Sequence, residues 1–488
     1  MDNAIKVLMV SSEYASLAKE GGLADAVASL SGALRRIGLD VRVVMPRYGF
    51  IPKGKLEPIP GSLGVPIGIR EEWVGVYRYD AGEIPVYLLD HEELFGRHGI
   101  YNESGLDYAD NPRRFTLLSY GALQLCRMLH WTPDVIHAHD WPGGLVPLFL
   151  QTRERRGAFE KTASCFTIHN IGYQGIFAPE QFVHTRLSWE EYSLVDFHGS
   201  FNILFSAIRS ADAVTTVSPR YAREILDPEF SFGLHHTLAA RGEELQGILN
   251  GIDLDIWDPE SDETLPKPFS VDDLSGKGEA KRELQRRFGL PEEEGVPLVG
   301  FIGRLAEHKG VRHLFDEPGG AAGRLCREED IQIVALGSGD PQIENQLREL
   351  SLELPNFGAY LGYDDELAHL IEGGADFLLI PSEYEPCGLN QMYSMRYGTI
   401  PITTDTGGLA DTVVDESAGV EATGFLFARP TIESIVAAVQ RAVTVYREDP
   451  GRIESLRKAG MERDFSWDRS ARAYRDLYEE AIRRRRRA

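Results

Sequence analysis

The sequence predicts an α/β protein built from two Rossmann-like domains that face each other across a deep interdomain cleft. Short apolar runs alternate with segments whose apolar residues are three and four positions apart, which is typical of parallel strands covered by helices. The segment GGLADAV at residues 21–27 returns as GGLADTV at residues 407–413, each time after an apolar run. A chain of 488 residues is also too long for one core. Two similar domains follow from these observations.

Composition and charge exclude several functional classes. A hydrophobic share of 43% rules out global disorder. The 51 basic and 75 acidic residues give a net charge of −24, which argues against nucleic acid or an anionic membrane as a partner. The arginine run at residues 483–487 is the exception, and we interpret it as a solvated helix end. The sequence leaves the oligomeric state open.

The cysteines predict a reducing compartment and no zinc site, because they are scattered and lack CxxC spacing. The apolar run at residues 7–10 is too short for a signal peptide, and no stretch approaches the length of a membrane span. We therefore expect a cytoplasmic protein. The four cysteines are Cys126, Cys165, Cys326 and Cys387.

The N-terminal half begins with a strand–loop–helix–strand unit. Residues 5–10 predict a buried strand, residues 23–37 a helix and residues 41–45 the next strand. Gly21 and Gly22 precede the helix, although without the GxGxxG spacing of a dinucleotide site. Two glycines let a ligand approach the backbone, and Lys19 is placed to meet an anion. The alternative is a glycine turn beside a surface lysine.

Residues 50–110 predict a loop-rich region, because prolines, glycines and aromatic residues are frequent there. A helix at about residues 107–129 and two strands at residues 134–141 and 164–170 follow. Ligands of open α/β sheets lie at the carboxyl ends of strands. We expect one histidine of the HxH pair to pack inward, and we favour polar ligand contacts over a metal. The polar residues at these strand ends are His137, His139, Asp140, His169 and Asn170.

A third strand at residues 213–218 and the NGID segment beginning at Asn250 complete the first half. We expect an N-terminal domain at residues 1–257 and an acidic, proline-containing linker at residues 258–278. The second domain is expected at residues 279–468, and a C-terminal helix at residues 469–488 is expected to pack back towards the first domain.

The second half carries candidate anion-binding groups. Arg304 and Lys309 follow a predicted strand at residues 298–303 inside a turn bounded by glycines, where two cations could clamp a diphosphate. Tyr363 follows another predicted strand and is suited to stacking on a base.

The segment PSEYEPCGLNQ at residues 381–391 follows a buried apolar run. It contains two carboxylates, Glu383 and Glu385, and a glycine, Gly388, before a helical pattern. A strand, a tight turn and a helix start point free backbone N–H groups at an anion, and a carboxylate at the same turn could face a sugar. The alternative is an ordinary loop with surface acids.

These motifs together resemble the bacterial glycogen synthases and plant starch synthases, which are glycosyltransferases of the GT-B fold. The resemblance covers nearly the whole chain. It rests on KxGGLAD (19–25), YxDNxxRF (108–115), HAHDW (137–141), HNxxYQGxF (169–177), TVSPxYAxE (216–224), LNGID (249–253), IGRLxxxKG (302–310), EPCGLNQ (385–391), RYGTxP and TGGLADTV (396–413), and DFSW (464–467).

The resemblance implies transfer of glucose, with retention of configuration, from a sugar nucleotide, usually ADP-glucose, to the non-reducing end of an α-1,4-glucan. It implies no cofactor and no metal. Lys19, Gly21 and Gly22 would face the donor phosphates and the acceptor, while Arg304 and Lys309 would neutralise the departing diphosphate. The remaining roles are implied for a diphosphate cradle (Gly388, Leu389, Asn390), adenine stacking (Tyr363) and the glucose pocket (Asp140, His169, Asn170, Asn250, Glu385).

Three alternatives stay open. The donor could be UDP-glucose, or the acceptor a small sugar; a catalytically silent relative is the third possibility, although Lys19, Arg304, Lys309 and Glu385 are all present. Glu385 could be a nucleophile or a positioning group, and we favour a front-face transfer. The chain also departs from the usual pattern of the family, at Glu20, Pro142, Phe205, Ser206 and His308.

Overall fold

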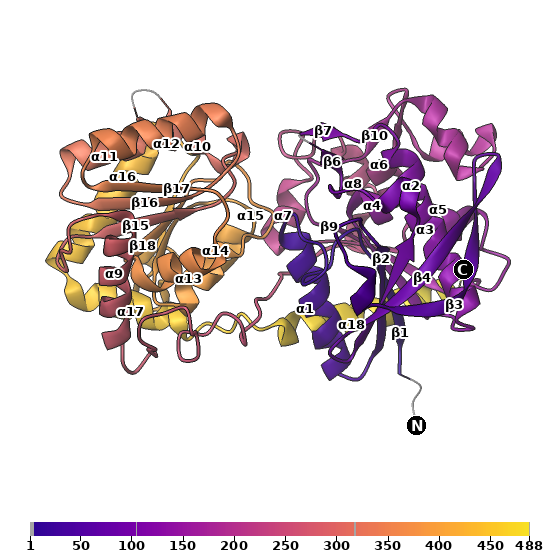
Figure 1. Ribbon diagram of the computed structural model, residues 1–488, viewed down its shortest axis with the longest axis horizontal. Coiled ribbons are helices and arrows are strands. Elements are labelled where there is room, and N and C mark those ends of the chain that lie inside the picture. The colour runs from indigo at the N-terminus through magenta and orange to yellow at the C-terminus, as the bar shows by residue number, and fades with distance from the viewer. Residues whose placement is uncertain (1–3, 104, 317–318, 488) are drawn as a thin grey trace. The chain divides into compact units, whose positions relative to one another are not determined.

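The computed structural model describes residues 4–103, 105–316 and 319–487. The chain divides into two compact units, each an α/β structure (Figure 1). Unit 1 contains the residues up to Gly251 together with those from Trp467 onward, and unit 2 contains Ile252–Ser466. Among the described residues, no helix combines the length and apolar character that crossing a membrane requires.

A nine-stranded sheet with the order β14-β13-β9-β8-β1-β2-β5-β4-β3 forms the centre of unit 1. Every neighbouring pair from β14 to β5 is parallel, while β4 runs antiparallel to both β5 and β3. The strands are β1 (Lys6–Val10), β2 (Asp40–Pro46), β3 (Glu57–Ile67), β4 (Arg70–Ala81), β5 (Ile84–Asp90), β8 (Val135–His139), β9 (Ala163–Ile168), β13 (Ala213–Thr216) and β14 (Leu245–Gly247).

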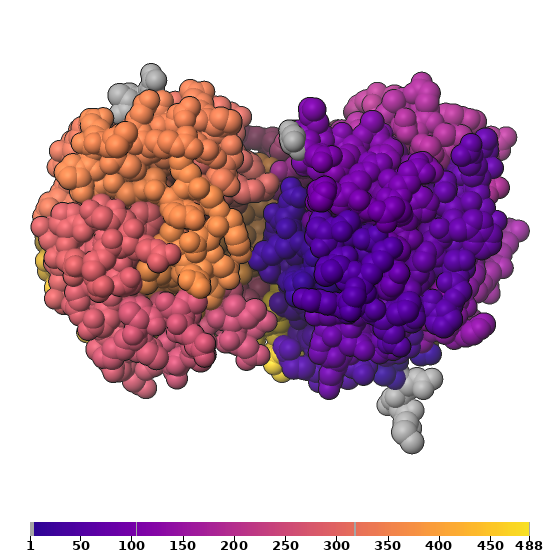
Figure 2. All heavy atoms as spheres, viewed as in Figure 1, coloured from indigo at the N-terminus to yellow at the C-terminus, as the bar shows by residue number. Residues whose placement is uncertain are grey.

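The helices of unit 1 cover this sheet, and α1 and α18 pack against each other (Figure 1). In Figure 2 the early residues of the chain, in indigo and purple, form most of the visible face of this unit. The helices are α1 (Gly22–Arg36), α2 (Glu92–Phe95), α3 (Asn111–Met128), α4 (Asp140–Gly143), α5 (Leu145–Thr152), α6 (Ile203–Ser210), α7 (Pro219–Glu224), α8 (His235–Ala239) and α18 (Trp467–Arg487). Short strands are β6 (Asn102–Glu103), β7 (Leu106–Asp107), β10 (Ile176–Phe177), β11 (Asp196–Phe197) and β12 (Ser200–Asn202).

The prediction of a loop-rich region at residues 50–110 is wrong, because β3, β4 and β5 lie within it. Strand β4 alternates buried and more exposed side chains, with Val74 and Val76 buried and Trp73 exposed, as expected for a sheet with one solvated face. The prolines that suggested loops lie mostly in β3, which is an edge strand of the sheet. An edge strand tolerates proline because one of its sides needs no ladder hydrogen bonds.

Unit 2 has a six-stranded, fully parallel sheet with the order β17-β16-β15-β18-β19-β20. Alternate residues of β15 enter different cores: Val299 and Phe301 pack into one core, and Leu298 packs into the other. Helices on both faces of the sheet explain why these strands are apolar throughout (Figure 1). The strands are β15 (Leu298–Ile302), β16 (Gln332–Gly337), β17 (Phe357–Leu361), β18 (Phe377–Ile380), β19 (Ile400–Thr404) and β20 (Phe425–Phe427).

The segment expected to be a linker, residues 258–278, packs on unit 2. Asp258 pairs with Arg396 at 2.7 Å, and Asp262 accepts a hydrogen bond from Tyr397 at 2.6 Å. The last residues of the segment already belong to helix α9. The helices of unit 2 are α9 (Ser275–Phe288), α10 (Val311–Phe315), α11 (Gly320–Glu328), α12 (Pro341–Glu353), α13 (Asp365–Gly374), α14 (Asn390–Arg396), α15 (Gly407–Thr412), α16 (Ile432–Glu448) and α17 (Pro450–Met461).

Candidate active site

Lys309 and Glu385 form a largely buried ion pair at the carboxyl end of the unit 2 sheet. Lys309 ends a short 3₁₀ helix after β15, and Glu385 lies in the loop after β18. Ser382 donates a second hydrogen bond to the same carboxylate oxygen, at 3.0 Å. Burial alone would raise the pKa of Glu385, but Lys309 and Ser382 lower it below its ordinary value. The carboxylate is therefore ionised at neutral pH.

The second GGLAD repeat holds the loop that carries Glu385. The N–H of Gly408 donates to the Glu385 carbonyl at 3.0 Å. A Cβ atom at Gly408 would overlap the main chain at Cys387, and one at Gly310 would overlap the Pro381 carbonyl. Glycine is needed at both positions because two backbones pass in contact there.

Arg304 and His308 complete the turn after β15. Arg304 is exposed and forms no ion pair with the residues that the structure describes. The His308 ring stacks on Tyr384 with centroids 5.3 Å apart. Burial, followed by the charges of Lys309 and Arg304, lowers the pKa of His308 to about 4. His308 is thus neutral at pH 7, and the positive charge of this turn comes from Arg304 and Lys309.

The start of helix α14 lies next to this turn. Asn390 donates from Nδ2 to the Ile302 carbonyl at 2.9 Å, which ties the helix to the end of β15. Gly388 has φ +69° and Leu389 is the N-cap residue. The first N–H groups of a helix have no acceptor inside it, so this turn presents donors beside Lys309 and Glu385.

Tyr363 follows β17, the outermost strand of the same parallel sheet. Its side chain is 77% exposed, and its hydroxyl donates to Asp365 at 2.9 Å. Strands β17, β16 and β15 are neighbours and parallel, so Tyr363 and Arg304 emerge at the same edge. Unit 2 thus gathers the predicted residues Arg304, Lys309, Tyr363, Glu385, Gly388, Leu389 and Asn390 at the carboxyl ends of its strands.

In unit 1, Glu13 organises the glycine turn and was missed by the sequence reasoning. Its carboxylate accepts hydrogen bonds from the N–H groups of Glu20, at 2.7 Å, and Gly21, at 3.1 Å, and from the Tyr101 hydroxyl at 2.5 Å. Burial raises the pKa of Glu13 more than these bonds lower it. The available signal was a carboxylate just after the first buried strand, comparable to Glu385 after β18.

Tyr101 is placed by the YxDNxxRF segment. Asn111 donates from Nδ2 to the Tyr101 carbonyl at 2.9 Å, and Arg114 donates to the Ile100 carbonyl at 2.9 Å. Arg114 is fully buried. This motif therefore has a structural role, because it fixes the loop from which the Tyr101 hydroxyl donates its hydrogen bond to Glu13.

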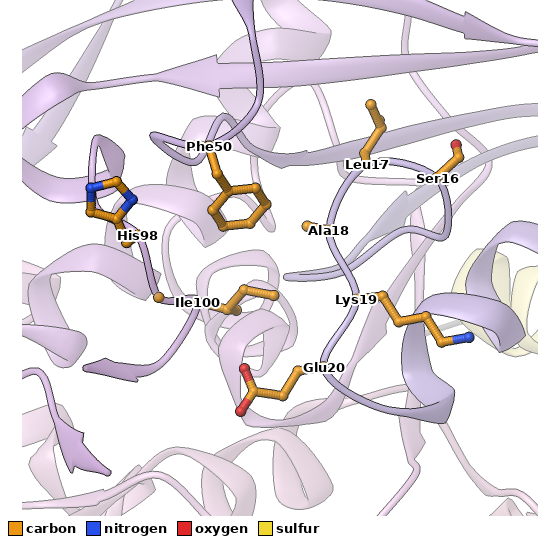
Figure 3. Close-up of a pocket in the computed structure, with 9 residues that line it drawn as sticks. Ser16, Leu17, Ala18, Lys19, Glu20, Phe50, His98 and Ile100 are labelled. Atoms are coloured by element: carbon orange, nitrogen blue, oxygen red, sulfur yellow. The ribbon is translucent and has the colours of Figure 1, made fainter. Parts of the chain in front are cut away.

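A pocket of about 420 Å³ lies beside the Lys19 loop (Figure 3). Phe50, which is 42% exposed, stacks on Tyr48 at 5.6 Å and lies near His98 in the pocket. Lys19 extends away from Phe50 towards α1, where its ammonium pairs with Asp25 at 2.9 Å. The full lining is Ser16, Leu17, Ala18, Lys19, Glu20, Phe50, His98, Gly99 and Ile100.

Asp140, His169 and Asn170 come together where β8 and β9 end. The Oδ1 atom of Asp140 accepts from the N–H of His169 at 2.7 Å and of Asn170 at 3.4 Å. Asp140 has φ +50°, a strained conformation for a residue with a Cβ. Burial raises its pKa to about 7, although the two N–H bonds act in the opposite direction.

The two histidines of the HxH pair are both buried, with ring centroids 4.0 Å apart. The expectation that only one of them packs inward is wrong, because residues two positions apart in a strand share a face. His137 bonds the Tyr478 hydroxyl of α18 at 2.8 Å and Thr167 at 2.6 Å, so it packs within the unit. His139 meets His169, with Nδ1 and Nε2 3.1 Å apart. No group of three or more His, Cys, Asp or Glu side chains in the described ranges could hold a metal ion. Asn250, the last predicted residue of unit 1, is buried just after β14.

The chain is similar to known protein families and solved structures over nearly its whole length. Residues 6–240 match the starch synthase catalytic domain family, and residues 282–458 match glycosyl transferases group 1. A glycogen synthase of Treponema denticola is 46% identical over 98% of this chain and 99% of its own, and one of Myxococcus xanthus is 43% identical over 98% and 100%. The catalytic domain of starch synthase IV from Arabidopsis thaliana, solved with ADP and acarbose, has a TM-score of 0.90 at 32% identity, covering 99% of this chain and 100% of its own.

Proposed function

Because this chain belongs to the glycogen synthase family of GT-B glycosyltransferases, we propose that it transfers glucose from ADP-glucose to the non-reducing end of an α-1,4-glucan, with retention of configuration. The likeness to a starch synthase domain bound to ADP and acarbose, over 99% of the chain, carries the proposal. Both the donor nucleotide and the retained configuration are part of what we propose.

Unit 2 would bind the donor. Arg304, Lys309 and the N–H groups around Leu389 supply fixed positive charge, which stabilises a departing diphosphate without a metal ion. Tyr363 offers an exposed aromatic face for the adenine. No cofactor takes part in the proposed reaction.

Unit 1 would bind the sugars. Asp140, His169, Asn170 and Asn250 would line the proposed glucose pocket with hydrogen-bonding groups. The pocket beside Lys19, with the half-exposed ring of Phe50 and His98, would hold glucose units further along the acceptor. Aromatic faces with neighbouring polar groups suit sugars, which have both apolar and hydroxyl-bearing surfaces.

We propose that Glu385 positions the glucosyl ring and does not attack it. Its carboxylate charge is already stabilised by Lys309 and Ser382, and such bonds reduce the nucleophilicity of a carboxylate. The leaving phosphate would then help to deprotonate the acceptor on the same face. Mass spectrometry of the enzyme quenched during turnover tests this assignment, and a glucosyl adduct on Glu385 would overturn it.

The donor is tested by supplying radiolabelled ADP-glucose or UDP-glucose with glycogen. We expect polymer labelling from ADP-glucose at a rate at least tenfold higher, and NMR of the first product should show a new α-linkage. Faster incorporation from UDP-glucose would favour the alternative donor, and no incorporation from either would contradict glucan synthesis.

A further inference from the structure

His139 and His169 lie on neighbouring strand ends and share one hydrogen bond. Strand β8 ends at His139, whose register partner in β9 is Thr167, two residues before His169. The Nδ1 atom of His139 and the Nε2 atom of His169 are 3.1 Å apart, with ring centroids at 5.3 Å. One of these nitrogens must carry the proton and the other must accept it.

Both imidazoles are neutral at pH 7. Burial lowers the pKa of His169 to about 3 and that of His139 well below its ordinary value. Each ring therefore carries one proton, and two arrangements remain. In the first, His139 donates from Nδ1 and His169 is protonated on its own Nδ1. In the second, His169 donates from Nε2 and His139 is protonated on Nε2.

The second arrangement leaves a buried N–H without an acceptor. His139 is 1% exposed, and its Nε2 atom has no hydrogen-bond partner within the described part of the chain. The adjacent His137 offers none, because its two ring nitrogens already face Tyr478 and Thr167. A buried orphan N–H is rarer in proteins than an under-satisfied acceptor. In the first arrangement the free N–H is on Nδ1 of His169, a residue that is only partly buried, so water can accept from it. The first arrangement is therefore the stable one.

We propose that His139 is a positioning residue that fixes His169 in the tautomer with its proton on Nδ1, so that His169 offers an N–H donor to a sugar hydroxyl oxygen. No described residue accepts a hydrogen bond from that nitrogen of His169. The sugar as acceptor rests on the proposed function; the tautomer does not.

The tautomer is measured directly by NMR of the full-length protein labelled with ¹⁵N in its histidine rings, without substrate, at pH 7. Protonated and bare ring nitrogens resonate in separate regions, and His169→Gln identifies the signals of that residue. We expect Nδ1 of His169 to be protonated and Nε2 to be bare. Protonation of Nε2, or an equal mixture, would overturn the proposal.

Two variants then link the tautomer to turnover. In His139→Asn the amide nitrogen can replace Nδ1 as the donor, so we expect the His169 tautomer to persist and kcat to fall less than threefold. His139→Leu removes the donor, so the Nε2-protonated form of His169 should become populated and kcat should fall about tenfold. An unchanged tautomer in His139→Leu would contradict the positioning role.

Thermal unfolding of both variants controls for a purely structural effect. If His139→Leu loses activity in proportion to folded fraction while the His169 signals stay as in the parent, His139 is only a packing residue and the proposal fails. Failure of the proposed function would look different, because the parent would then make no glucan while the tautomer result still held.

Discussion

Gly408 donates its N–H to the Glu385 carbonyl at 3.0 Å, and the space for a side chain at Gly408 is filled by the main chain at Cys387. The glycine turn of unit 1 is different. Gly21 corresponds to Gly407 of the repeat, and a Cβ at Gly21 would have no atom within 4 Å, whereas one at Gly407 would overlap the Glu385 carbonyl. We expect Gly408→Ala to lower the free energy of unfolding of unit 2 by about 1–3 kcal/mol and to displace Glu385. Gly21→Ala should leave the melting temperature unchanged. Calorimetry of the pair checks this, and equal melting temperatures would contradict it.

Replacing Lys309 with Met should lower kcat by about 10²–10³-fold, because a fixed cation for the departing diphosphate is lost. Removing one member of a buried ion pair also destabilises a protein, so the double variant Lys309→Met, Glu385→Gln separates folding from chemistry. We expect the double variant to recover melting temperature but not activity. Lys53→Met is the matched control, since the half-exposed Lys53 pairs with Asp90 at 2.8 Å away from the candidate site. Full turnover in Lys309→Met would refute the assigned role.

The Asp140 carboxyl should change its charge around neutrality, because burial raises its pKa to about 7. If the carboxylate accepts a hydrogen bond from a sugar hydroxyl, the ionised form binds better, so kcat/KM should rise between pH 6 and pH 8. The contribution of Asp140 to the free energy of unfolding has the opposite pH dependence. It is fully present below the ordinary pKa of 3.8 and is lost as the pH rises through about 7.

Asp140→Asn keeps an acceptor for the two N–H groups but cannot ionise. Its kcat/KM should be low and flat over the same pH range, and its stability should lose the corresponding pH dependence. Rate profiles and urea unfolding at pH 6, 7 and 8 measure both. If kcat/KM of Asp140→Asn still falls towards pH 6, another group is responsible for the pH dependence.

Phe50→Ala should raise KM for long glucan acceptors about five- to tenfold, which corresponds to about 1–1.4 kcal/mol, and should leave KM for ADP-glucose unchanged. The reason is that Phe50 supplies the exposed aromatic surface of the pocket beside Lys19. Trp73→Ala is the control, because Trp73 is 65% exposed on β4 and does not line the pocket. Equal effects of the two substitutions would contradict a specific acceptor contact.

The fold, and the placement of site residues at the ends of strands, could be predicted because both depend on residues that are close together in the sequence. Apolar runs mark β8, β9, β15 and β18, and polar residues directly after each strand lie at the same sheet edge once the strands are parallel. The two-unit α/β architecture was predicted on this basis and is confirmed.

The contacts between distant segments could not be predicted. Glu13 and Tyr101 are 88 positions apart, and His137 and Tyr478 are 341 apart, so no spacing rule connects them. The spacing of apolar residues also did not reveal β3, because this edge strand contains several prolines and glycines. Likewise, the sequence does not show which histidine nitrogen finds a partner, because that depends on the packing of three side chains.

Helix α18 has a consequence for the way the chain is made. The Tyr478 hydroxyl reaches the buried His137, and Tyr474 and Leu477 belong to the core of unit 1. A ribosome synthesises this helix after every other part of that core. Unit 2, whose residues are contiguous, can fold during translation, whereas unit 1 keeps an open core until α18 has been synthesised. A nascent chain stalled before Trp467 should therefore expose the apolar surface of unit 1 to chaperones, although most of its residues were made first.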